Sequence, residues 1–261
     1  MAFTTTDPGA RTPVRRPGSV QVVIPVYNEE SQLAESVHVL HAHLAAELAS
    51  PWEIAIADNA STDRTWAIAT ELASELTHVT ALHLDRQGRG LALRTAWMGS
   101  TADIVSYMDV DLSTNLDCLL PLLASLRSGH SEVAIGSRLL PASRIRRQLK
   151  REVLSRGYNT LIHLLFRCRF SDAQCGFKAL TRDAAHRLLP LVENNTWFFD
   201  TELLLHASRL GYRIFEVPVD WIEDLDTRVN LQRTALEDLR GLWRVRRRFW
   251  ALGRARRREG T

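Results

Sequence analysis

The stretch DIVSYMDVDLSTN, residues 103–115, joins one strand of the expected sheet to the candidate chemistry of this chain. Its first half is a short apolar run, and its second half carries Asp109 and Asp111, two carboxylates one residue apart. Side chains of an extended strand alternate between faces, so we expect both carboxylates on one side and Val110 toward the protein body. Two like charges this close predict a positive partner between them.

Similar apolar runs recur along the chain and alternate with helical patterns. The runs are VQVVI, EIAIA, VTALHL and EVAIG, and the helical patterns cover residues 30–48, 65–76 and 90–99. This alternation predicts an α/β fold with a mostly parallel, Rossmann-like sheet flanked by helices. Ligands bind beyond the carboxyl ends of such strands, so the loops PVYNEE, DNASTD and DVDLST are expected to form one site.

The chain divides into three segments by composition. Residues 1–18 lack periodicity and are predicted to be disordered. Residues 19–228 are expected to form a single catalytic domain, with an apolar helix over 153–166 and a late strand within 212–221. Residues 229–261 are predicted to form a basic amphipathic C-terminal helix.

Composition excludes several classes of protein. The three cysteines include no CxxC pair, which argues against a zinc or disulfide framework and favours a reducing cytoplasm. No apolar run approaches about 18 residues, and the N-terminus lacks the apolar segment of a secretory signal, so no membrane span is expected.

Positive charge is concentrated near the C-terminus. Residues 240–258 hold nine arginines and no acid, in a chain of net charge +3. This segment predicts an anionic partner, and its interleaved aromatic residues favour a membrane surface. RNA and a solvated end are the alternatives, although no nucleic-acid-binding motif accompanies the charge.

The aspartate pair has two interpretations. Paired carboxylates after a strand bind hard divalent cations such as Mn²⁺ or Mg²⁺. Alternatively, one aspartate caps the following helix and the other is solvated. Thr114 and Asn115 can supply the cap, which favours the metal interpretation for Asp109 and Asp111.

Two further loops point to a nucleotide. Asp58 closes the second apolar run and is predicted to accept hydrogen bonds from a base, whereas Asp63 is better placed to cap a helix. The QGRG stretch lacks GxGxxG and a Walker lysine, so we expect Gly88 and Gly90 to let the backbone pass close to a ligand. Arg89 between them either faces phosphate or is solvated.

Basic residues suggest a second anion site. Arg138 follows the fifth apolar run, and Arg151 and Ser155 are one helical turn apart on one face. A guanidinium fork suits phosphate, although surface arginines are commonly only solvated. Two such arginines beside a predicted metal site favour anion binding.

The ordered motifs resemble the family 2 glycosyltransferases of GT-A fold, and within them the polyprenyl-phosphate (dolichyl-phosphate) hexose synthases. The motifs, which span Val20 to Arg228, are VVIPVYNEE, ADNASTDRT, QGRGLALRTA, YMDVDLST, AIGSRL, KREVLSRGYN, SDAQCGFKAL, WFFDTELLL and EVPVDW. The QxxRW signature of processive synthases is absent, which favours a single sugar transfer.

The resemblance implies inverting, metal-dependent transfer of a hexose from GDP-mannose or UDP-glucose to a polyprenyl phosphate. The enzyme would work peripherally at the cytoplasmic membrane face. Alternatives are a family 2 enzyme acting on a soluble or protein hydroxyl, or a non-catalytic nucleotide-sugar-binding protein. Asp200 and Glu202 are the base candidates for a hydroxyl acceptor; otherwise we expect them to organise the acceptor loop.

Individual roles also follow from the resemblance. The nucleotide-sugar pocket would contain Pro25, Tyr27, Asn28, Glu29, Asp58, Gly88, Gly90, Asp109, Val110 and Asp111. The acceptor phosphate would be held by Arg138, Arg151 and Ser155, assisted by Asp172 and Gln174. Arg228 matches a mobile-loop arginine that closes on the donor. Ser113 stands where some relatives have a glutamine that contacts the metal, which leaves the third ligand open.

Overall fold

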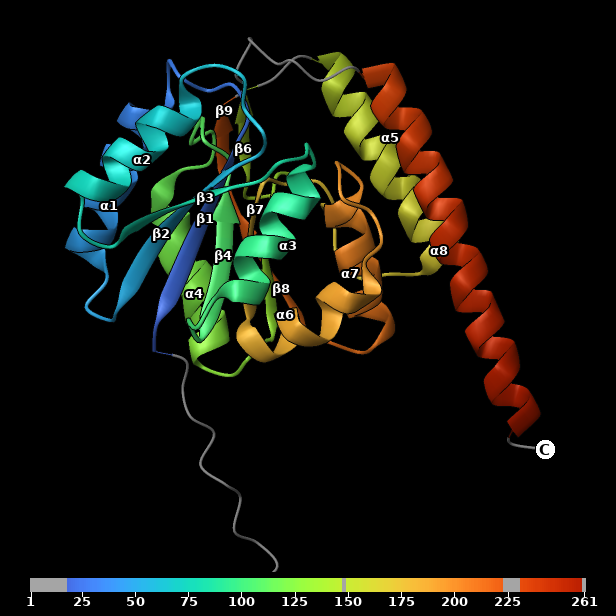
Figure 1. Ribbon diagram of the computed structural model, residues 1–261. Coiled ribbons are helices and arrows are strands. Elements are labelled where there is room, and N and C mark those ends of the chain that lie inside the picture. The colour runs from blue at the N-terminus through green and yellow to red at the C-terminus, as the bar shows by residue number, and fades with distance from the viewer. Residues whose placement is uncertain (1–17, 147–148, 223–230, 260–261) are drawn as a thin grey trace, which may run out of the picture.

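A computed structural model describes residues 18–146, 149–222 and 231–259 of the chain (Figure 1). Its main sheet has seven strands in the order β3-β2-β1-β4-β7-β5-β8. The strands are β1 (Val20–Val26), β2 (Trp52–Asp58), β3 (Val79–His83), β4 (Ile104–Met108), β5 (Val133–Ser137), β7 (Phe177–Thr181) and β8 (Ile214–Pro218). The five apolar runs of the sequence all form strands of this sheet, as predicted.

One strand breaks the parallel pattern. β7 pairs antiparallel with both β4 and β5, whereas the other pairs in the sheet are parallel. A second, two-stranded sheet joins β6 (Arg144–Arg146) to β9 (Asp220–Ile222). The mostly parallel sheet is confirmed, and the insertion of β7 was not anticipated.

Helices cover both faces of the sheet. They are α1 (Leu33–Glu47), α2 (Thr65–Glu75), α3 (Arg89–Gly99), α4 (Leu119–Arg127), α5 (Leu149–Phe166), α6 (Arg182–Leu188), α7 (Phe199–Arg209) and α8 (Leu231–Glu259). Residues of α1, α2 and α4 pack with Val22 and Ile24 of β1, whereas residues of α3, α6 and α7 pack with Val23. Strand alternation therefore separates two core layers, one on each face.

The C-terminal helix α8 is more than a basic tail. Leu242 and Val245 are each 1% exposed and belong to the same core layer as α3 and α7. α8 contacts α5 and α7, and it runs past the end of α5 (Figure 1). Within the described ranges, no helix is both long and apolar enough to cross a membrane.

Candidate active site

The loops after β1 and β2 meet at the carboxyl edge of the sheet, as predicted. Asn28 adopts a left-handed conformation (φ 55°), and its Oδ1 accepts a 2.8 Å hydrogen bond from the Thr62 backbone N–H. The Glu29 N–H donates to Thr65 Oγ1 at 2.7 Å. Pro25 and Tyr27 are half-buried beside this junction. Asn28 and Glu29 are thus held in place by the loop that follows β2.

Asp58 lies deeper than its predicted role suggests. It is fully buried, and its Oδ2 lies 2.6 Å from Nδ1 of His83, its register partner on β3. Its Oδ1 is buried and has no hydrogen-bond partner within the described structure. This oxygen is an acceptor for an N–H group that reaches it. Asp63, by contrast, accepts from the Thr65 N–H at 2.9 Å at the start of α2, although Arg64 and not Asp63 is the N-cap residue of that helix.

A turn, not a strand, presents the aspartate pair. β4 ends at Met108, and a 3.2 Å hydrogen bond from Leu112 N–H to Asp109 O closes the turn. We expected Asp109 and Asp111 to lie on one side because side chains alternate along a strand. That reason is wrong, because the backbone turns here. Both carboxylates nevertheless line one small cavity, and Val110 is buried as expected.

The cavity at this turn suits a small cation. Its volume is about 10 Å³, room for about one water-sized sphere. Ser113 also lines it, and Ser113 Oγ is buried without a hydrogen-bond partner among the residues described. A Cβ at Gly176 would lie 1.7 Å from Asp109 Oδ2. Any residue other than glycine there would displace the Asp109 carboxylate.

Two carboxylates and a hydroxyl are oxygen ligands of the kind that Mn²⁺ and Mg²⁺ take. Within the described ranges, no group of three or more His, Cys, Asp or Glu side chains could hold a metal ion. Asp109, Asp111 and Ser113 therefore fit part of the coordination shell of a divalent cation. Oxygens from a bound ligand or water would complete that shell.

The positive partner of Asp109 is Arg89. Its Nη2 lies 2.5 Å from Asp109 Oδ1, and its Nη1 lies 2.6 Å from Asp200 Oδ2. Its guanidinium also lies over the Tyr107 ring, 4.9 Å from the ring centroid. Of the two interpretations of Arg89, the solvated one is wrong, because only 12% of its side chain is exposed.

Asp200 anchors this cluster from α7. Its Oδ1 lies 3.0 Å from Nζ of the fully buried Lys178 and accepts a hydrogen bond from the Tyr107 hydroxyl. Burial raises the pKa of Asp200, but Lys178 and Arg89 outweigh this effect and hold the pKa below its ordinary value. Lys178 was not predicted from the sequence, although a lone charge inside the strand FKALT is a signal for a buried ion pair.

The Glu202 carboxylate is likewise engaged in hydrogen bonds within the protein. It is 1% exposed, and its Oε2 accepts hydrogen bonds from the backbone N–H groups of Glu193 and Asn194 and from Arg244 Nη2. Neither Glu202 nor Asp200 presents a base to solvent. Glu202 holds Glu193, Asn194 and α8 rather than the loop around residues 171–177, so the predicted role of this pair in organising the acceptor loop stays a prediction.

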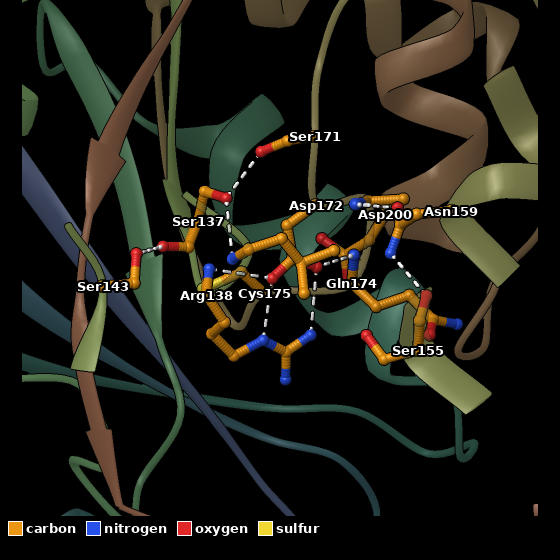
Figure 2. A network of polar contacts seen from close by, with 12 residues as sticks. Ser137, Arg138, Ser143, Ser155, Asn159, Ser171, Asp172, Gln174, Cys175 and Asp200 are labelled. Atoms are coloured by element: carbon orange, nitrogen blue, oxygen red, sulfur yellow. Dashed lines mark hydrogen bonds and ion pairs between the residues drawn. The ribbon is translucent and has the colours of Figure 1, made fainter. Parts of the chain in front are cut away.

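Arg138 and Asp172 form a buried two-pronged pair (Figure 2). Arg138 Nε donates to Asp172 Oδ2 at 2.8 Å, and Nη2 donates to Oδ1 at 3.0 Å. Burial raises the pKa of Asp172, but the Arg138 guanidinium outweighs this effect and lowers it. In this structure, two donors of the predicted phosphate-binding fork engage the chain's own carboxylate.

The loop that contains Asp172 is held by α5 and α8. Asn159 Oδ1 accepts from the Ala173 N–H at 2.9 Å, and Asn159 Nδ2 donates to the Ser155 carbonyl at 2.9 Å (Figure 2). Gln174 Nε2 donates to Asp238 Oδ2 of α8 at 2.9 Å. Ser155 Oγ is buried and finds no partner in the described structure.

Two predicted residues cannot be placed. The side chain of Arg151 and the whole of Arg228 lie outside the described part of the chain. Their assigned roles stay predictions.

The glycines of QGRG approach protein rather than open space. A Cβ at Gly88 would lie 2.6 Å from the Asn195 carbonyl oxygen, and one at Gly90 would lie 2.5 Å from Cβ of Phe199. The close approach expected at both positions is therefore made by the segment that leads into α7. This packing brings Arg89 to Asp200, and the predicted contact of the glycines with a nucleotide stays a prediction.

Comparison with solved structures confirms the class of fold. Glucosyl-3-phosphoglycerate synthase from Mycobacterium tuberculosis, solved with Mn²⁺, UDP and phosphoglyceric acid, superposes with a TM-score of 0.62 at 20% identity. The match covers 84% of this chain and 74% of that one. The fold is therefore that of the GT-A glycosyltransferases.

Sequence comparison then identifies the family. The profile of glycosyl transferase family 2 matches residues 21–189, so the chain belongs to that family. Glycosyltransferase AglD of Haloferax volcanii is 40% identical over 236 residues, which cover 89% of this chain and 37% of that protein. The dolichyl-phosphate β-glucosyltransferase ALG5A of Trichomonas vaginalis is 31% identical over 218 residues, covering 79% of this chain and 67% of that protein. The chain thus spans only part of the length of these curated relatives.

Proposed function

We propose that the protein transfers a glucosyl group from UDP-glucose to a dolichyl-type polyprenyl phosphate, with inversion at the anomeric carbon. The observation that most supports this proposal is the cavity lined by Asp109 and Asp111, together with the ion pair between Arg89 and Asp109. Relatives named dolichyl-phosphate β-glucosyltransferases support the acceptor class and favour glucose over mannose. A β-linked product is what inversion of an α-linked nucleotide sugar would give.

The chemistry requires two anions to meet. A donor diphosphate and an acceptor phosphate repel each other, and cationic groups must offset this repulsion. Arg89 and Arg138 are both largely buried, at 12% and 13% side-chain exposure, where a positive charge acts more strongly than in water. We assign Arg89 to the donor side and Arg138 to the acceptor side.

A divalent cation would be held by Asp109 and Asp111, with Ser113 Oγ as the third protein oxygen. When bound, it would neutralise charge on the leaving diphosphate as a Lewis acid. The hydroxyl of Ser113 is assigned because a buried oxygen without a partner costs about 1–3 kcal/mol and this one borders the cavity.

The acceptor needs no general base from the protein. A phosphate monoester has its second pKa near 6 and is mostly ionised at neutral pH. The engagement of Asp200 by Lys178 and of Glu202 by backbone N–H groups supports such an acceptor. It counts against the alternative of a soluble or protein hydroxyl acceptor, which would need one of these groups as a base. We place the reaction at the cytoplasmic face of a membrane, with the protein attached peripherally.

The test is incubation with membranes, Mn²⁺ or Mg²⁺, and radiolabelled UDP-glucose or GDP-mannose, followed by organic extraction. We expect extractable label from UDP-glucose only, and its loss in Asp111→Ala. Label in a water-soluble product would refute the lipid acceptor. Extractable label from GDP-mannose would refute the choice of glucose, and full activity of Asp111→Ala would refute the metal assignment.

A further inference from the structure

A large groove lies away from the aspartate pair, between α8 and the ends of α5 and α7. Its volume is about 1130 Å³. It is lined by Leu205, Ser208 and Arg209 from the second half of α7, whereas Asp200 lies at the start of that helix. The groove and the cavity at Asp109 and Asp111 share no lining residue, although Arg244 of the groove also binds Glu202.

The groove is lined by cations. Among the residues that the structure describes, six arginines and no aspartate or glutamate border it: Arg167, Arg209, Arg244, Arg246, Arg247 and Arg248. Arg244 and Arg248 pair with Glu193, and Arg246 donates to the carbonyl of Leu165. The other three arginines have no carboxylate partner within the described ranges. Such a lining fits an anionic group, and guanidinium suits phosphate.

An apolar stripe runs along the exposed side of α8. Leu236, Leu239, Trp243 and Trp250 are 50%, 52%, 64% and 62% exposed. Their spacings of three, four and seven residues place them on one helix face. Seven of the eleven large hydrophobic side chains exposed in the described structure belong to α5 and α8, so exposed apolar surface is concentrated on these two helices.

The two features occur together. Trp243 and Trp250 border the arginine-lined groove as well as the stripe, and Arg254 stacks on Trp250 with its guanidinium carbon 3.6 Å from the ring centroid. Leucine and tryptophan flanked by arginine is the pattern of a helix that lies in a membrane interface. A purely apolar partner would leave the arginines without counter-charges.

We propose that the groove and the stripe, Leu236, Leu239, Trp243 and Trp250, together form a docking face for anionic phospholipid bilayers. The stripe enters the boundary between headgroups and acyl chains, and the groove's arginines surround lipid phosphates. This inference deepens the proposed function, because a lipid acceptor has to be reached from a bilayer. Asp238 of α8 also contacts Gln174, which joins the docking face to the predicted acceptor loop.

The test is co-sedimentation of the full chain with vesicles of phosphatidylcholine alone or with 30% phosphatidylglycerol. We expect binding to the anionic vesicles and a blue shift of tryptophan emission. Trp243→Ser with Trp250→Ser should lower partitioning at least tenfold. Val39→Ser, which removes a 47%-exposed apolar side chain on α1, is the matched control and should bind normally.

The charge component is tested separately. Arg209→Gln with Arg247→Gln should reduce the preference for phosphatidylglycerol by about fivefold for each arginine. Competition by millimolar inorganic phosphate would instead indicate a soluble-phosphate site and overturn the bilayer assignment. Unchanged vesicle binding of the tryptophan variant would also overturn it, as would a solution dimer that buries Trp243 and Trp250.

Failure of this inference is distinguishable from failure of the proposed function. If the native protein binds anionic vesicles but transfers no sugar to lipid, only the proposed function is refuted. If it transfers sugar to lipid but does not bind the vesicles, only the docking face is refuted.

Discussion

Asp200 is predicted to stabilise the fold far more than Asp109, although Arg89 touches both. The change is Asp200→Asn, which removes a charge while keeping the side-chain volume. It leaves the 0%-exposed Lys178 ammonium without its 3.0 Å carboxylate partner. Breaking a buried pair by removing one partner costs about 3–5 kcal/mol.

The matched control is Asp109→Asn. The Asp109 side chain is 44% exposed, and an exposed ion pair contributes about 0–1 kcal/mol. Equilibrium urea unfolding at pH 7 measures both variants. With an m-value of about 3 kcal/mol/M, we expect the unfolding midpoint of Asp200→Asn to fall by about 1 M or more. That of Asp109→Asn should change by a few tenths of a molar.

A double variant tests the cause. Adding Lys178→Met to Asp200→Asn removes the charge left alone, so part of the lost stability should return. Equal losses in Asp200→Asn and Asp109→Asn would refute the reasoning, and so would a double variant that is less stable than Asp200→Asn alone.

Three further predictions concern α8 and the turn that carries Asp109 and Asp111. Burial raises the pKa of Asp238 to about 7 from an ordinary 3.8, so the folded state keeps a proton that the unfolded chain loses. Stability should therefore fall as pH rises from about 4 to 7, and Asp238→Asn should flatten that slope in a series of melting temperatures. Ser113→Ala should weaken Mn²⁺ binding on the order of tenfold by calorimetry, and Ser113→Cys should shift preference toward Cd²⁺; unchanged Mn²⁺ affinity would exclude the hydroxyl. Gly176→Ala should abolish Mn²⁺ binding by displacing the Asp109 carboxylate, whereas Gly157→Ala, whose Cβ meets nothing within 4 Å, should bind normally.

Local sequence patterns were sufficient for much of the fold. Each apolar run from VQVVI to EVAIG forms a strand. In β1, β4 and β5 almost every residue is buried, because burial on both faces of a sheet demands a mostly apolar short segment. Because ligands bind at the carboxyl ends of parallel strands, the loops after β1, β2 and β4 could be predicted to lie at one edge of the sheet. These inferences need only neighbouring residues and topology.

The polar contacts of the site required the folded chain. Arg89 meets Asp200 across 111 positions, and Gln174 meets Asp238 across 64. Periodicity does not report such pairs, because it describes which face a residue occupies and not which distant residue lies opposite. The antiparallel β7 has the same origin, since strand direction follows from chain path rather than composition.

The C-terminal segment shows the same division within one helix. Its arginine-rich, amphipathic character is legible in the letters from 240 to 258. The sequence does not show which apolar residues of this helix join the core. Leu242 is 1% exposed, whereas the adjacent Trp243 is 64% exposed. Helical spacing sorts residues into faces, but only packing against α5 and α7 selects the face that is buried and leaves the other for a partner.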